Sequence, residues 1–115
     1  MTQVERRGAV RVPARLAMEI VVGEDAAHVE TVNVSASGVY FTSTTFIEPL
    51  TKLRIVLDIP AEGGKSGGLV CDGVVVRTEP EAQESAGTEY QVACYFTDVA
   101  DTERLEKYIL SHVPF

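Results

Sequence analysis

The stretch KLRIVLDIP, residues 52–60, has the most regular alternation of side chains in this sequence. Every second position holds a large branched apolar residue, namely Leu53, Ile55, Leu57 and Ile59. Successive side chains of a β-strand point to opposite faces, so this pattern predicts a strand with one buried face. Pro60 ends the strand, because proline has no N–H group to donate to a neighbouring strand.

Segments on both sides of this stretch show the same two-residue period. We expect further strands at residues 14–22, 29–35, 38–42, 70–77 and 90–96. The residues expected to share buried faces are Leu16, Met18, Ile20 and Val22 in the first of these strands, Val32 and Val34 in the second, and Tyr90, Val92, Cys94 and Phe96 in the last. The chain is therefore predicted to be all-β over most of its length.

The period changes only near the C-terminus. After Asp98, apolar and aromatic residues fall at helical spacing, at Leu105, Tyr108, Ile109 and His112. Asp98 is a suitable N-cap, since its carboxylate can accept hydrogen bonds from the first turn. The pattern predicts an amphipathic helix over residues 98–112.

About six short strands and one helix indicate a single small domain over residues 1–115. Closure of the strands into a barrel removes exposed sheet edges, and the helix can cover one opening. We predict a small six-stranded antiparallel β-barrel at residues 14–97, followed by the C-terminal amphipathic helix. Residues 1–13 are expected to be a flexible N-terminal loop that carries arginines.

The charge of the chain restricts the kind of partner. The 115 residues carry a formal net charge of -7 at pH 7, which disfavours general attraction to nucleic acid polymers or anionic lipid. The sequence has no apolar run of the roughly 18 residues that a membrane span needs, and no secretory signal is visible. We expect a cytoplasmic protein without membrane insertion.

The residues that commonly carry catalysis or metals are few and scattered. Cys71 and Cys94 are the only cysteines, and His28 and His112 are the only histidines. The cysteines are expected to be reduced and buried, since neither lies in a CxxC motif. No local motif marks a nucleophile, an acid–base pair or a metal site, so neither an enzyme nor a metal centre is predicted.

An arginine cluster stands out against this acidic background. The stretch ERRGAVR, residues 5–11, contains Arg6, Arg7 and Arg11. Guanidinium is planar and always charged, grips phosphate through parallel hydrogen bonds and stacks on aromatic rings. Arg7 and Arg11 on one loop therefore suit a ligand with phosphates and bases. The alternative is a basic tail that pairs with the 17 carboxylates of the chain.

A second polar segment is NVSASG, residues 33–38. If Val32 and Val34 face inward, Asn33 and Ser35 face outward together and present an amide and a hydroxyl. Gly38 is expected to turn the chain with positive φ and to allow close approach. The alternative is a hairpin of ordinary turn-forming residues.

Together, the two segments form an RxxxR motif followed by (D/N)xSxxG. This combination resembles the PilZ domain, a bacterial receptor for the second messenger cyclic di-GMP. The matching residues are Arg7, Arg11, Asn33, Ser35 and Gly38, and the resemblance extends over essentially the whole chain. Arg11 and Arg15 form a second RxxxR, but Arg15 begins an alternating strand, so the first pair is preferred.

The resemblance implies a ligand, a mode of binding and a role. Cyclic di-GMP would lie against the outer barrel wall, held by Arg7 and Arg11, with Asn33 and Ser35 bonding to guanine and no other cofactor. Arg6 would add a stacking plane, which favours an intercalated ligand dimer. Ligand binding would order the N-terminal loop and signal to a downstream protein. The alternative is a PilZ-fold interaction module that binds no nucleotide.

Overall fold

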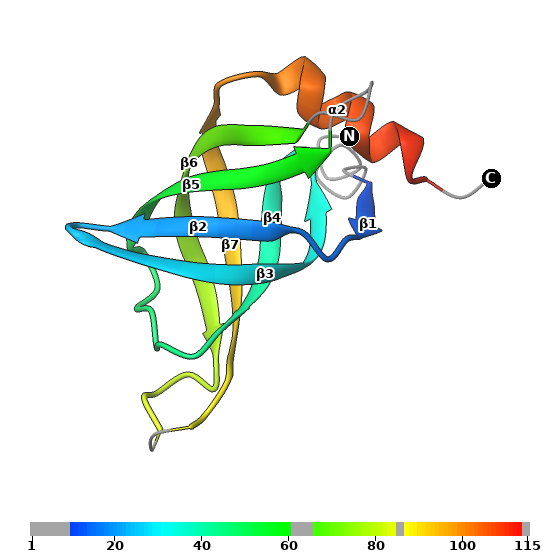
Figure 1. Ribbon diagram of the computed structural model, residues 1–115. Coiled ribbons are helices and arrows are strands. Elements are labelled where there is room, and N and C mark those ends of the chain that lie inside the picture. Colours follow the sequence, from blue (N-terminus) through cyan, green and yellow to red (C-terminus); the bar gives the residue numbers. More distant parts are fainter. Residues whose placement is uncertain (1–9, 61–65, 85–86, 114–115) are drawn as a thin grey trace, which may run out of the picture.

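The computed structural model describes residues 10–60, 66–84 and 87–113, which form a β-barrel and one helix (Figure 1). The strands and helix are β1 (Arg11–Pro13), β2 (Ala17–Val22), β3 (Asp25–Ser35), β4 (Gly38–Ser43), β5 (Lys52–Pro60), β6 (Ser66–Glu79), β7 (Tyr90–Val99) and α2 (Thr102–Ser111).

Six strands close into a barrel. Their hydrogen-bonded order is β3-β2-β5-β6-β7-β4, and β4 pairs again with β3. Every pairing is antiparallel, and β1 pairs with the C-terminal end of β3, beyond the part of β3 that pairs with β2. The predicted six-stranded barrel with a C-terminal helix is confirmed. Figure 1 shows α2 across one end of the barrel, and the β6–β7 turn extends from the other.

The alternation that predicts β5 also fills the barrel. Leu53, Ile55, Leu57 and Ile59 are at most 3% exposed. Inward residues of the other strands join them, including Met18, Ile20, Val34, Phe41, Val75 and Val92, and α2 contributes Leu105, Tyr108 and Ile109. The helix thus closes the barrel end with its apolar face, as its spacing predicts.

Strand β3 departs from simple alternation at one point. Its pairing with β4 shifts register between Thr31 and Asn33. Such a bulge inserts an extra residue and changes which side chains face inward. Val32 is therefore 42% exposed while Thr31 is buried, so the prediction that Val32 faces the core is wrong.

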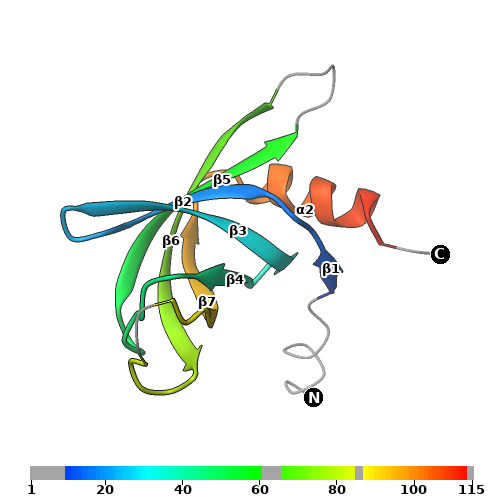
Figure 2. The ribbon, with the colours of Figure 1, turned by 60° about the horizontal axis from the view of Figure 1, so that its bottom comes forward.

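The N-terminal boundary also differs from the prediction. Residues 11–13, expected to be loop, form β1, in which Arg11 lies opposite Ser35 and Pro13 opposite Asn33. Val12 is fully buried, and this burial holds the short strand on the barrel. Figure 2 shows β1 beyond the end of β2, near the C-terminal part of α2.

The helix begins later than the sequence pattern suggests. Asp98 still belongs to β7, where it pairs with Asp72, so it is not the helix cap. Asp101 is the cap, and its Oδ1 accepts a hydrogen bond from the Arg104 N–H at 3.1 Å. The Arg104 guanidinium donates to the carbonyls of Ile59 (2.9 Å) and Gly67 (2.6 Å), so α2 is tied to β5 and β6.

Candidate ligand-binding site

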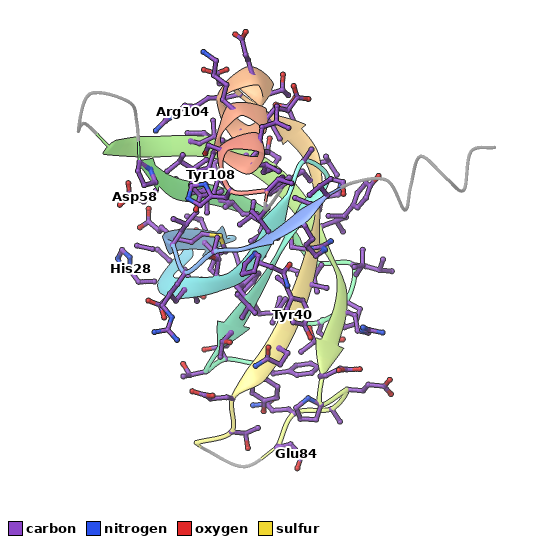
Figure 3. All side chains as sticks on the ribbon, turned by 90° about the vertical axis from the view of Figure 1, so that its right-hand side faces the viewer. His28, Tyr40, Asp58, Glu84, Arg104 and Tyr108 are labelled. Atoms are coloured by element: carbon purple, nitrogen blue, oxygen red, sulfur yellow. The ribbon has the colours of Figure 1, made fainter. Side chains whose placement is uncertain are left out.

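A pocket of about 310 Å³ lies on the outer wall of the barrel. It is built by β1, β3, β4, β6 and β7, and its lining residues are Arg11, Asn33, Gly38, Val39, Tyr40, Val76, Arg77, Ala93, Cys94 and Tyr95. Figure 3 labels Tyr40 between the helical end of the barrel, marked by Arg104 and Tyr108, and the turn that carries Glu84. Three of the predicted site residues line this pocket, namely Arg11, Asn33 and Gly38.

Arg11 and Asn33 form a hydrogen-bonded pair. The Arg11 Nη1 donates to Asn33 Oδ1 at 2.7 Å. The pairing of β1 with β3 makes this contact possible, since it sets Pro13 beside Asn33 and leaves the outward side chain of Arg11 within reach. A guanidinium has five N–H donors. Within the described residues, the Arg11 side chain donates only to Asn33, and the Asn33 amide N–H groups donate to none.

Ser35 does not face outward with Asn33 as predicted. It is fully buried, and its Oγ accepts hydrogen bonds from the backbone N–H groups of Ser37 (3.1 Å) and Gly38 (3.2 Å). Ser35 is the last residue of β3, and its hydroxyl turns back into the connection to β4 instead of continuing the alternation. Its observed role is to hold the turn that positions Gly38.

Gly38 is required for close approach rather than for an unusual backbone angle. Among the described residues, positive φ occurs at Gly23, Leu50 and Gly87, so the predicted positive φ at Gly38 is wrong. A Cβ built on Gly38 would collide with the carbonyl oxygen of Cys94 and lie 3.3 Å from the Tyr95 Cα. The expected close approach is therefore present, and it is between β4 and β7.

The other arginines of the two RxxxR motifs differ in position. Arg6 and Arg7 lie outside the described residues. Arg15 is described, and its side chain is 84% exposed, with Nε 3.6 Å from Glu30 Oε1. It borders a separate hollow with Pro13 and Val32 rather than the pocket of Arg11 and Asn33. This placement argues against a joint site for Arg11 and Arg15, and the pairing of Arg11 with Arg7 stays a prediction.

Sequence reasoning missed seven residues of the pocket lining, of which Tyr40, Arg77 and Tyr95 have side chains suited to ligand contacts. Tyr40 is partly exposed and lines the pocket, whereas its neighbour Phe41 is buried in the core. The available signal for Tyr95 is its outward position between the buried Cys94 and Phe96. That signal does not identify which strands lie beside it.

The pocket is cationic in a strongly acidic protein. Among the described residues, its lining contains two guanidinium groups, from Arg11 and Arg77, and no carboxylate, while Glu79 Oε2 lies 3.7 Å from Arg77 Nε beside it. The residues that the structure describes include no group of three or more His, Cys, Asp or Glu side chains placed to hold a metal ion. In the same residues, no helix has the length and apolar character needed to cross a bilayer. The arrangement is suited to an organic anion with rings.

The two cysteines are buried and unpaired. Burial raises the pKa of the Cys71 thiol to about 11, with smaller contributions from Asp72 and Asp98. Burial also raises the pKa of Cys94 to about 12. A protonated, buried thiol is a poor nucleophile, so these groups act as apolar packing residues.

These features define a class of protein, a small antiparallel β-barrel domain with a cationic ligand pocket on its outer wall. Within that class, the chain belongs to the PilZ domain family, whose family model matches residues 5–111. The match includes both motifs and extends through the helix.

Two solved structures share the fold. The Bacillus subtilis inhibitor of motility, MotI/DgrA, superposes with a TM-score of 0.77 at 20% identity, over 92% of this chain and 50% of that protein. MrkH, described as a c-di-GMP-dependent transcription regulatory factor, has a TM-score of 0.61 at 20% identity, over 88% of this chain and 48% of its own. This chain thus spans about half the length of each. A comparison with curated proteins finds no match.

Proposed function

We propose that this domain is a receptor for cyclic di-GMP that passes the signal to a partner protein. The observation that carries the proposal is the Arg11–Asn33 pair at the edge of a pocket whose described lining includes a second arginine, Arg77, and no carboxylate. Membership of the PilZ family supports it, as does the description of MrkH, a structural relative, as c-di-GMP-dependent.

In the proposed complex, each site residue has a separate role. The Arg11 guanidinium binds a phosphodiester, and Arg7 supplies a second guanidinium from the N-terminal segment. The amide of Asn33 bonds to the edge of a guanine, while its Oδ1 keeps Arg11 in position. Ser35 acts indirectly in this arrangement, because its hydroxyl holds the turn. Gly38 also acts indirectly, because the absence of a Cβ allows β4 to pack directly against the backbone of Cys94 and Tyr95.

The strength of these contacts is adequate for a receptor. A micromolar dissociation constant corresponds to about -8 kcal/mol, and each hydrogen bond to a charged group contributes about 1.5 to 3 kcal/mol. Three or four such bonds together with base stacking exceed the entropy lost on binding. No polymeric nucleic acid contact is needed to account for the site.

Signalling follows from the position of the arginine segment. In the proposed switch, the ligand draws residues 1–10 onto the barrel wall beside β1, and the newly ordered surface is recognised by the downstream protein. Arg6 stacks on an exposed guanine and favours a second, intercalated ligand molecule. The stoichiometry measured by calorimetry tests the binding of a second ligand molecule. A value of one ligand per protein would contradict it.

Calorimetric titration of the whole chain tests the receptor function. Cyclic di-GMP is expected to bind, whereas cyclic di-AMP and GTP bind at least tenfold more weakly. Arg11→Ala and Arg7→Ala are each expected to abolish measurable binding. Arg15→Ala is the matched control, because it also removes an exposed arginine but lies outside the pocket. Unchanged affinity in Arg11→Ala would contradict the proposal, and absence of binding by the wild type would favour the interaction module.

A further inference from the structure

We propose that Arg77 on β6 is a second phosphate-binding residue, which takes the phosphodiester of the ligand that Arg11 does not reach. This inference rests on the proposed function and extends it to a wall of the pocket that neither motif contains. Arg77 lines the same pocket as Arg11, although its strand is far from β1 in the chain.

The strand register places Arg77 at the opposite end of one row of residues. Asn33 pairs with Tyr40, Tyr40 with Ala93, and Ala93 with Arg77. Three strand spacings separate the ends of this row, which is about 14 Å along the wall. The guanidinium that bonds to Asn33 and the guanidinium of Arg77 therefore stand on opposite sides of the pocket.

Small residues form the surface between Arg11 and Arg77. Ala93 has a small side chain, and Gly38 lines the pocket with backbone atoms alone, between Tyr40 and Tyr95. Tyr95 is 54% exposed, and it pairs with Gly38 across the β4–β7 ladder. A planar base has room over Gly38 and Ala93, with the ring of Tyr95 at its edge or face.

Arg77 is available to a ligand, in contrast to Arg54 and Arg104. Its Nε lies 3.7 Å from Glu79 Oε2, with both side chains at least half exposed, and an ion pair of this kind contributes little. Arg54, by comparison, donates two hydrogen bonds to Asp72, and Arg104 donates two to backbone carbonyls.

The chemistry of the ligand calls for two cationic sites. Cyclic di-GMP has two phosphodiester groups on opposite sides of one ring, and each carries a negative charge. A guanidinium that is already held by Asn33 can face one of them. The other needs a cation across the pocket, and Arg77 is the lining residue that supplies it.

Titration calorimetry with cyclic di-GMP tests this role. Arg77→Ala is expected to weaken binding by about tenfold or more, because a charge-assisted hydrogen bond to phosphate is lost. Arg77→Lys is expected to recover part of the affinity, since it restores the charge without the planar fork. Tyr95→Ala is expected to weaken binding more than Tyr95→Phe, which keeps the ring.

Arg54→Ala is the matched control, since it removes the same charge from an exposed strand position outside this pocket. Its affinity should stay within about twofold of the wild type, as removal of one surface charge has only a weak, screened effect. Melting temperatures of all variants report whether the barrel is intact.

The possible results separate this inference from the receptor function. Wild-type binding together with unchanged affinity in Arg77→Ala overturns the role of Arg77 and leaves the receptor function standing. Equal losses in Arg77→Ala and Arg54→Ala also overturn it, because net charge would then explain both. Absence of binding by the wild type overturns the receptor function and this inference with it.

Discussion

Asn33 and Ser35 belong to one short motif, yet their side chains do different things. Asn33 reaches the outer wall and bonds to Arg11, whereas Ser35 is buried and bonds to the turn that follows it. Loss of the Ser35 hydroxyl is therefore expected to loosen the turn, and any effect on the proposed ligand site would be indirect. The same distinction between contact and support applies to Gly38.

Gly38→Ala is expected to destabilise the fold by about 2 kcal/mol or more, because forcing extra atoms into a packed site moves the surrounding backbone. The atoms that a Cβ would meet are backbone atoms of Cys94 and Tyr95, which cannot rotate away. Urea unfolding followed by circular dichroism measures the change. Gly67→Ala is the control, since its nearest neighbour would be the end of the Arg104 side chain at 3.7 Å. An equal loss in both variants would contradict this explanation.

At the scale of single elements, the ends of the strands and the helix depend on partners more than on local pattern. Strand β7 continues through Asp98 because it still pairs with β6 there. The helix begins only where this pairing stops, at Asp101. Asp98 and Asp101 both fit the local sequence pattern of an N-cap. The start of the helix therefore depends on how far the pairing of β6 with β7 extends.

Asp101→Ala is expected to lower the free energy of unfolding by about 1 kcal/mol, the usual effect of removing an N-cap. The reason is the loss of the acceptor for the Arg104 N–H. Asp98→Ala should change stability by less than about 0.5 kcal/mol, as is usual at exposed surface positions. Thermal or urea unfolding of the two variants decides between the caps, and a larger loss in Asp98→Ala would contradict the assignment.

At the scale of the whole molecule, closure of the barrel creates both the core and the pocket. Strand β4 pairs with β7 and with β3, which brings the motif on β3 and β4 beside the outward residues of β6 and β7. The same closure buries Cys71 and Cys94. Their ionisation is therefore linked to folding.

Stability is expected to fall as the pH rises above 9. Burial raises the thiol pKa from 9.0 to about 11 in Cys71 and about 12 in Cys94. Below pH 9, both thiols are protonated in the folded and unfolded chains, so their stabilising effect is fully present. Above pH 9, the unfolded chain ionises first and is favoured, until the folded thiols ionise near pH 11 to 12.

Urea midpoints at pH 8, 9 and 10 measure this dependence. Cys71→Ala with Cys94→Ala should reduce the slope of stability against pH, even if the double variant is less stable at every pH. Other groups that titrate in this range, such as Tyr108 with its raised pKa, remain in the variant. An identical slope would show that the thiols do not ionise differently in the two states.

Much of this fold follows from the sequence alone. The two-residue period of β5 and its neighbours predicts strands with one buried face. The helical spacing of Leu105, Tyr108 and Ile109 predicts which face of α2 packs against the barrel core. The order of the two motifs is also a property of the chain, and it leads to the family. These features depend on residues close together in the chain or on their order along it, so they can be predicted from the sequence.

Other features were decided only by the tertiary structure. The bulge that exposes Val32 depends on the register of β3 against β4. The burial of Ser35 depends on the turn into which its hydroxyl folds. Arg77 and Tyr95 join Arg11 and Asn33 because the barrel closes and brings strands that are distant in the chain to one wall. A side-chain period specifies which face a residue is on, but the neighbours across that face are set by strand pairing between remote segments.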